Sequence, residues 1–284
     1  MTFFGVCYSP YHRTNLSPPN GVTADDVDKD MAIIAARKFT HIRTYGVDGG
    51  NQWNVDKATK YGLTLGLGVW IDSDPVKTKA HIDWAAEQLS EAYKKYNKVF
   101  TIDLVVGNEV DRTDVARYSP AQIKNAMDYA IKKRGGPIEW RVTTCFSGTV
   151  LQHENSPWLP IVDACETCVY LTVYPWYGGA SPGNIDDQME WSWNNGLKQV
   201  AARGKPVLIA EIGWPSAGGR DTSPENERIN YGVTQKWVTS GPHGAFDTFW
   251  FEMFDEPWKT EEGAQGPHWG LYTSGANPQP KFDF

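Results

Sequence analysis

The chain has 284 residues and a mass of 31.8 kDa, a size that allows two small domains or one large domain with a single core. Its formal net charge of −7 and its isoelectric point near 5.4 argue against nucleic acid and anionic membrane as partners. No stretch approaches about 18 consecutive apolar residues, so no membrane-spanning segment is predicted. The N-terminus, MTFFGVCYSP, lacks the basic region and long apolar core of a signal peptide, so we expect either an intracellular protein or a processed form.

Strand-like and helix-like segments alternate along the chain. The predicted strands cover residues 3–9, 41–46, 63–71, 101–110, 140–148, 169–178, 206–216 and 245–254. The predicted helices cover residues 24–38, 53–61, 77–96, 120–134, 157–165, 185–203 and 224–239. The Ser119-Pro120 pair marks the start of the fourth helix, and the Gly- and Pro-rich residues 266–284 are expected to form a wrapping tail.

This alternation predicts a parallel sheet, because parallel neighbours need a helical crossover. Eight units in about 250 residues fit a closed (β/α)8 barrel, the TIM barrel, better than a doubly wound open sheet. No GxGxxG turn follows the first strand, which further disfavours the open sheet. We therefore expect one catalytic barrel domain covering residues 1–284.

Chemistry in such a barrel takes place where the strands end and the loops to the helices begin. The polar and aromatic residues at the predicted strand ends are Tyr8, Arg43, Tyr45, Trp70, Asp72, Asn108, Glu109, Tyr174, Trp176, Glu211, Glu252, Asp255 and Glu256. They include no metal-like cluster of His and Cys, no Ser-His-Asp set and no strand-end Lys that would form a Schiff base. No metal and no cofactor are therefore expected.

Two glutamates stand out among these residues. Glu109 ends the fourth predicted strand and Glu211 the seventh, and strands three apart in an eight-strand ring direct their tips across its mouth. Two carboxyl groups about 5 to 5.5 Å apart catalyse retaining glycoside hydrolysis, and a wider separation serves inversion. The alternative for each glutamate alone is a solvated turn residue or a neighbour of a helix N-cap.

Aromatic residues are numerous, with 13 Trp, 13 Tyr and 11 Phe, which suits either a heavy core or a sugar-binding cleft. One of Trp70 and Trp176 is expected to contact a ligand, although both are also candidates for plain packing.

The four cysteines give little information about function or redox compartment. Cys165 and Cys168 form one CxxC without a second pair to complete a zinc site, and Cys7 and Cys145 are expected to be buried thiols far apart.

Several motifs together resemble family 17 glycoside hydrolases, the β-1,3-glucan-cleaving barrels of plants and fungi. In chain order they are GVCYSP (5–10), IRTYG (42–46), GNEV (107–110), VYPWYG (173–178), EIGWPSAGG (211–219), FEMFDEPWK (251–259) and HWGLY (268–272). The resemblance spans nearly the whole chain, and FEMFDEPWK has the fungal form.

The resemblance implies that Glu109 is the acid/base and Glu211 the nucleophile. It further implies that Asn108 holds the sugar 2-hydroxyl, that Tyr174 donates to the nucleophile, and that Glu256 and Lys259 support the cleft. The remaining residues expected to bind substrate are Tyr8, Arg43, Tyr45, Trp70, Trp176 and Trp214. The chain departs from the family at Ile212, where a small hydroxyl residue is usual, and at Thr172, where Asn is common.

These features predict a monomeric retaining enzyme with β-1,3-glucan as donor and acceptor, and the resemblance places it in the secreted or cell-wall fraction. Glucan is favoured over water as the acceptor, with a platform formed by Phe146, Trp158, Trp176 and Tyr177; a hydrophobic patch is the alternative for these four. A hydrolase remains the alternative activity. Two rivals are a non-catalytic glucan-binding barrel and a lyase or isomerase barrel, for which WPSAGG (214–219) would be a faint phosphate loop.

Overall fold

The computed structural model describes residues 2–19, 21–112, 118–135, 138–148 and 155–284. Nine parallel strands form one sheet in the order β5-β4-β3-β2-β1-β9-β8-β7-β6. Their bounds are β1 (Phe4–Cys7), β2 (His41–Arg43), β3 (Thr64–Val69), β4 (Thr101–Val106), β5 (Arg141–Thr143), β6 (Cys145–Ser147), β7 (Val169–Thr172), β8 (Val207–Ile212) and β9 (Thr248–Trp250). The strands are shorter than predicted, because their last residues turn out of the sheet into loops.

The barrel closes through a strand that is broken in the middle. β5 and β6 are the two halves of the predicted strand 140–148, and they pair with β4 and β7 respectively. The buried hydroxyl of Thr144, between the halves, donates to the carbonyl of Val106 at 2.6 Å, and the amide of Val110 donates to the carbonyl of Cys145 at 3.1 Å. Side-chain and loop hydrogen bonds thus replace ladder bonds at the seam, and the fold is the predicted (β/α)8 barrel.

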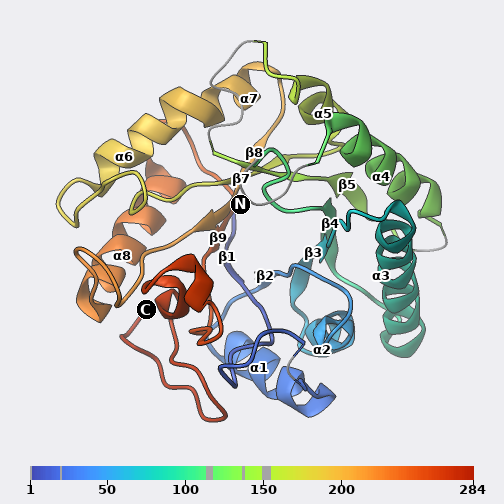
Figure 1. Cartoon of the computed structure of the whole chain (residues 1–284), viewed down its shortest axis with the longest axis horizontal. Helices are drawn as coiled ribbons and strands as arrows, with labels where there is room; N and C mark the ends of the chain where they lie inside the picture. Colours follow the sequence, from blue (N-terminus) through green and yellow to red (C-terminus); the bar gives the residue numbers. More distant parts are fainter. Residues whose placement is uncertain (1, 20, 113–117, 136–137, 149–154) are drawn as a thin grey trace.

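The helices form a ring around the sheet (Figure 1). Their bounds are α1 (Ala24–Ala36), α2 (Asn54–Lys60), α3 (Pro75–Tyr96), α4 (Pro120–Lys133), α5 (Leu159–Ala164), α6 (Ile185–Ser192), α7 (Lys198–Ala202) and α8 (Pro224–Ser240). A π-helical turn, Trp193–Leu197, joins α6 to α7, so the predicted helix 185–203 is one helix with an internal irregularity. None of the helices in the described residues has the length and apolarity that crossing a membrane requires.

Side-chain caps determine where several of these helices begin. Ser119 and Gln122 form a capping box at α4, as the Ser119-Pro120 pair predicted, and Thr23 and Asp26 form another at α1. Each box satisfies amide groups that have no partner inside the helix. The caps fix the positions at which the loops from the strand ends enter the helices.

After β9 the chain forms two short 3-10 turns, Thr260–Glu262 and Gly266–His268, and then the expected wrapping tail. Figure 1 shows this C-terminal segment, in red, between α8 and α1. The Lys281 side chain, which is 6% exposed, anchors the tail, with Nζ 2.7 Å from Asp255 Oδ1 and 2.6 Å from Ser216 Oγ. The tail therefore completes the wall of the barrel after β9, where a regular (β/α)8 barrel has its last helix.

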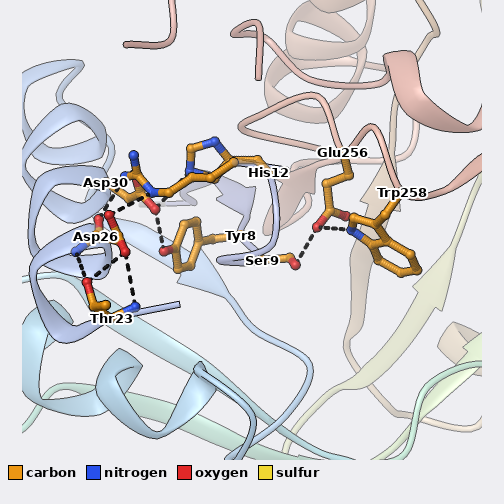
Figure 2. Close-up of polar contacts among 9 residues, drawn as sticks. Tyr8, Ser9, His12, Thr23, Asp26, Asp30, Glu256 and Trp258 are labelled. Carbon is orange, nitrogen blue, oxygen red and sulfur yellow. Dashed lines mark hydrogen bonds and ion pairs between the residues drawn. The ribbon is translucent and has the colours of Figure 1, made fainter. Parts of the chain in front are cut away.

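The loop after β1 is anchored to α1 through the fully buried carboxyl group of Asp30 (Figure 2). Tyr8 donates its hydroxyl to Oδ2 at 2.8 Å, His12 Nε2 lies 2.9 Å from the same oxygen, and Arg13 donates to Oδ1. The His12 ring also stacks on Phe254, with 4.1 Å between the ring centroids. Asp30 thus connects α1 to the loop after β1 and, through His12, to Phe254 in the segment after β9.

This geometry predicts that Asp30→Ala destabilises the fold strongly, because it leaves buried polar groups and the Arg13 charge without their carboxylate. A loss of roughly 3 kcal/mol or more in the free energy of unfolding is expected, measured by urea denaturation. The matched control is Asp28→Ala on the same helix, where Asp28 forms an exposed ion pair with Lys60. Equal losses for the two variants would contradict the anchoring role of Asp30.

Candidate active site

Asn108 and Glu109 follow β4 in a tight turn. Gly107 has a φ of 85°, and a side chain there would lie 2.5 Å from Val110 Cγ1 and 2.9 Å from Ile71 Cδ1, so the turn requires glycine. Glu109 itself has a φ of 44°, in the left-handed region that residues with a side chain rarely adopt. Strained conformations of this kind concentrate at functional sites.

Glu211, in β8, is 4% exposed and surrounded by hydrogen-bond donors. Arg43 Nη1 and the Tyr45 hydroxyl donate to Oε1 at 2.6 and 2.9 Å, and the Tyr174 hydroxyl donates to Oε2 at 2.6 Å. An ionised carboxylate only accepts hydrogen bonds, and each of these three partners donates. The surroundings of Glu211 therefore fit a carboxylate held in one orientation.

Glu109 has different surroundings. Burial raises the pKa of its carboxyl above the ordinary value, and the charge of Glu211 raises it further. Two bonds oppose this rise: Thr172 donates its hydroxyl to Oε1 at 2.6 Å, and Arg112 Nη1 lies 2.7 Å from Oε2. Because burial and Glu211 outweigh these partners, Glu109 holds its proton at a higher pH than an exposed glutamate does.

Arg43 connects the two carboxyl-bearing segments. Its guanidinium group is 1% exposed and donates through Nη2 to Asn108 Oδ1 at 2.6 Å, in addition to the bond to Glu211. The same group lies over the ring of Tyr45, 4.8 Å from the centroid. One side chain from β2 therefore positions both Asn108 and Glu211, beside a hollow lined by residues of β2, β3 and β4.

A buried ionic cluster lies behind Glu211. Lys259 Nζ is 3.1 Å from both oxygens of Glu252 and 2.5 Å from Glu256 Oε2. Burial lowers the pKa of Lys259, but the two glutamates outweigh that effect and leave its pKa raised. The ammonium group lies 4.5 Å from the ring centroid of Phe251, which packs edge-on against Tyr174.

Glu256 also anchors two further segments, since Oε1 accepts hydrogen bonds from Ser9 Oγ at 2.5 Å and Trp258 Nε1 at 3.2 Å (Figure 2). The structure therefore brings together three residues from the end of the last strand: Glu252, Glu256 and Lys259. Through Phe251 they support Tyr174, whose hydroxyl donates to Glu211. Among the described residues, no group of three or more His, Cys, Asp or Glu side chains is arranged to hold a metal ion.

Residues 5–270 match the family model described as the BtgE/BtgC glycoside hydrolase domain. The chain belongs to this family. It is 28% identical over 314 residues to the putative glucan endo-1,3-beta-glucosidase btgC of Aspergillus niger, covering 98% of this chain and 43% of the relative. It is also 28% identical over 318 residues to the glucan endo-1,3-beta-glucosidase btgC of Emericella nidulans, covering 98% and 45%. The chain thus spans less than half the length of these relatives.

Solved structures share the fold of this BtgE/BtgC domain. A glycoside hydrolase family 17 β-1,3-glucanosyltransferase from Rhizomucor miehei superposes with a TM-score of 0.72 at 24% identity, covering 99% of this chain and 97% of the other. A structure of plant β-glucan endohydrolases gives a TM-score of 0.74 at 20% identity, covering 99% of both chains. At these identities the likeness establishes the barrel and its topology.

Two residues near Glu109 in the BtgE/BtgC domain were not among the predicted site residues. Arg112 is an ion-pair partner of Glu109, yet an arginine in a sequence such as VDRT looks like a solvated turn residue. Thr172 was noted only as a departure from the usual Asn, and its hydroxyl contacts Glu109 directly. The only sequence signal for Thr172 was its position two residues before Tyr174-Pro175, where relatives in the resembled family commonly have Asn.

The structure corrects three predictions of substrate contact. Tyr8 and Trp214 have no exposed surface, and their polar atoms are bonded within the protein, to Asp30 and to the Asp221 carbonyl. Trp176 is 8% exposed, and the guanidinium group of Arg220 lies 5.5 Å from its ring centroid, so a sugar has no free face to stack on. These residues stabilise the walls of the barrel.

The predicted acceptor platform is also largely buried. Phe146 has no exposed surface and Trp158 is 9% exposed, and the two rings pack edge to face against each other. The hydrophobic-patch alternative is therefore correct for these two and for Trp176. Tyr177, which is 56% exposed, and Trp70, which is 51% exposed, retain surface for a ligand.

All four cysteines are free thiols. Cys7 and Cys145 are buried free thiols, as predicted, and the charge of Arg43 acts on both. Burial raises the pKa of both thiols, to about 12 for Cys145, and the Arg43 charge opposes that rise in each. Their burial makes them part of the barrel interior.

The raised pKa of Glu109 predicts a pH-dependent gain in stability for Glu109→Gln. Below the ordinary value of 4.5 the carboxyl is protonated in both the folded and the unfolded chain, so the substitution changes little. As the pH rises, the Glu109 carboxyl ionises in the unfolded chain before it does so in the folded protein. The wild type therefore loses stability until the pH passes the raised pKa that Glu109 has in the folded protein. Thermal unfolding should therefore show a gain of about 2 °C or more at pH 7 and almost none at pH 4.

The control for this measurement is Glu225→Gln on α8. Arg228 lowers the pKa of the exposed Glu225 carboxyl, so this variant should show no gain at either pH. A gain for Glu109→Gln that is equal at pH 4 and pH 7 would show that side-chain shape, and not charge, is responsible.

Proposed function

We propose that this domain is a retaining enzyme of glycoside hydrolase family 17 that acts on β-1,3-glucan through a covalent glucosyl-enzyme. The observation that carries the proposal is the contrast between two carboxyl groups at one barrel mouth. Three donors hold Glu211, whereas burial and the Glu211 charge raise the pKa of Glu109. Such a contrast supplies one ionised and one protonated carboxyl group at the same pH.

In the first step, a carboxylate oxygen of Glu211 attacks the anomeric carbon, and the bond from that carbon to the leaving oxygen breaks. Glu109 transfers its proton to the leaving oxygen, which departs as a sugar hydroxyl and leaves an ester between Glu211 and the glucosyl unit. Asn108, positioned by Arg43, is the candidate partner of the sugar 2-hydroxyl. Arg43, Tyr45 and Tyr174 keep the attacking carboxylate oriented.

In the second step, the now ionised Glu109 removes a proton from the acceptor hydroxyl, whose oxygen attacks the anomeric carbon and releases Glu211. A water acceptor gives hydrolysis, and a glucan acceptor gives a longer chain. The glucan endo-1,3-beta-glucosidases among its relatives support β-1,3-glucan as substrate, and the family resemblance supports action in the cell wall or outside the cell.

We favour transfer to glucan, accompanied by some hydrolysis. Tyr177 offers an exposed ring 5.7 Å from that of Tyr174, and Tyr174 contacts Glu211. An acceptor sugar on Tyr177 would lie close to the glucosyl-enzyme, where orientation gives it an advantage over water. The likeness in fold to the Rhizomucor miehei glucanosyltransferase is consistent with this choice, and an endo-hydrolase is the second candidate.

The two glutamates are predicted to respond differently to removal. Glu211→Ala should abolish turnover of an aryl β-laminarioside, and added azide should restore it by forming the α-glucosyl azide. Glu109→Ala should retain activity on substrates with acidic leaving groups, and azide should then give the β-product, because the covalent intermediate still forms. The stereochemistry of each azide product, determined by NMR, reports the role of the missing carboxylate.

Glu225→Ala provides the control, since this exposed glutamate on α8 pairs with Arg228. It should keep wild-type activity on every substrate. Azide products of the opposite anomeric configuration would exchange the two roles, and full activity of Glu211→Ala would refute the proposed chemistry.

Transfer and hydrolysis are distinguished by the products from laminaripentaose. If glucan is the preferred acceptor, chains longer than five glucose units should appear early, with less reducing-end release than the number of bonds cleaved. Mass spectrometry of a time course at several substrate concentrations gives both quantities. Shorter products alone, even at the highest concentration, would show that the enzyme is a hydrolase.

A further inference from the structure

Exposed tryptophans are concentrated in one sector of the barrel. Among the residues that the structure describes, four tryptophans are exposed, and three of them lie between residues 53 and 84: Trp53 (36%), Trp70 (51%) and Trp84 (43%). Figure 1 shows α2, β3 and α3 next to one another in this sector, across the barrel from α6, which carries the fourth, Trp191. Single exposed apolar side chains are normal on a protein surface, whereas several that gather in one sector mark a candidate binding surface.

Trp70 lies beside the catalytic turn. It directly follows Val69, the last residue of β3, which pairs with Val106 at the end of β4. The amide of Gly107 donates to the Val69 carbonyl at 2.9 Å, so Trp70 and Asn108 leave the sheet from adjacent strands at the same barrel end. The exposed ring thus belongs to the rim of the proposed active site.

His81 connects Trp70 to Trp84. Its Nδ1 lies 2.9 Å from the Trp70 carbonyl, which only accepts hydrogen bonds, so Nδ1 carries the proton. Its ring centroid is 5.5 Å from that of Trp84, one turn further along α3. His81, whose side chain is 12% exposed, therefore contacts both the Trp70 backbone and the Trp84 ring, and it connects the end of β3 to α3.

Polar groups border these rings. The Asp48 carboxylate, 56% exposed, is 3.6 Å from His81 Nε2 on one side, and Asp72 and Lys77 form a pair at 3.7 Å after Trp70. Pyranose rings present C–H groups on their faces and hydroxyl groups at their edges. Flat indole faces bordered by carboxylates and an ammonium group match that distribution, and they do not match a wholly apolar partner.

We propose that the exposed rings of Trp70 and Trp84, connected through His81, form an accessory binding site for a β-glucan chain, continuous with the catalytic cleft and extending along α3. The identity of the ligand rests on the proposed function. A chain long enough to occupy both the cleft and α3 gains contacts with Trp84 that a short oligosaccharide does not reach. The accessory site thereby gives the enzyme a preference for long chains.

The test measures binding of glucans of different length to the full chain carrying Glu109→Gln, in which turnover is suppressed. Calorimetric titration with laminarin should show roughly tenfold weaker binding when Trp84→Ala is added, the size expected for one lost stacking contact. The loss should shrink towards none for laminaritriose. Trp84→Phe, which keeps an aromatic face, should recover part of the affinity for laminarin.

Trp191→Ala in the same background is the matched control, because Trp191 is 47% exposed, close to the 43% of Trp84, but lies on α6. Equal laminarin affinity for the Trp84→Ala and Trp191→Ala proteins would overturn the accessory site. If the wild type processes laminaripentaose while Trp84→Ala has no effect on laminarin, the proposed activity stands and this inference fails. If Trp84-dependent laminarin binding is found without any turnover of β-1,3-glucan, the accessory site stands and the proposed activity fails.

Discussion

The arrangement of the barrel mouth depends on one buried guanidinium group. Arg43 extends from β2 to Glu211 and the Ala210 carbonyl in β8, and to Asn108 after β4, with its charge removed from water. A buried cation of this kind is tolerated only when acceptors surround it, so the positions of Glu211 and Asn108 are fixed by the need to satisfy Arg43. The same constraint aligns Tyr45, whose ring lies under the guanidinium group and whose hydroxyl reaches Glu211.

Buried ionic groups perform a second task, which is to attach irregular segments to the barrel. Asp30 attaches the loop after β1, Lys259 attaches the segment after β9 through two glutamates, and Lys281 attaches the C-terminal tail. These segments also bury apolar side chains, such as Met253, Phe254 and Leu271, but hydrophobic packing is non-directional. Charge-assisted bonds in a low-dielectric setting specify direction as well as distance, which suits segments that carry or support the proposed catalytic groups.

The tryptophans illustrate what composition leaves open. The sequence has 13 of them, and indole rings serve equally well as core filling and as platforms for sugars. Trp176 and Trp214 lie within the motifs VYPWYG and EIGWPSAGG, near Tyr174 and Glu211, yet both are packed inside the walls. Trp84, which no motif marked, lies on the surface. A tryptophan that is close in sequence to a proposed catalytic residue can therefore be either buried or exposed to solvent.

The sequence by itself determined the alternation of strands and helices, the barrel, and the placement of Glu109 and Glu211 at strand ends, because these follow from local patterns that repeat along the chain. Only the tertiary structure decided which groups meet across the barrel: Arg112 and Thr172 at Glu109, the seam at Thr144, and the burial of Tyr8, Phe146 and Trp158. Thr172 and Glu109 are 63 residues apart in sequence and 2.6 Å apart at their oxygens. Closure of the ring brings them together, because it places distant strands side by side and turns each side chain either into the barrel or out of it.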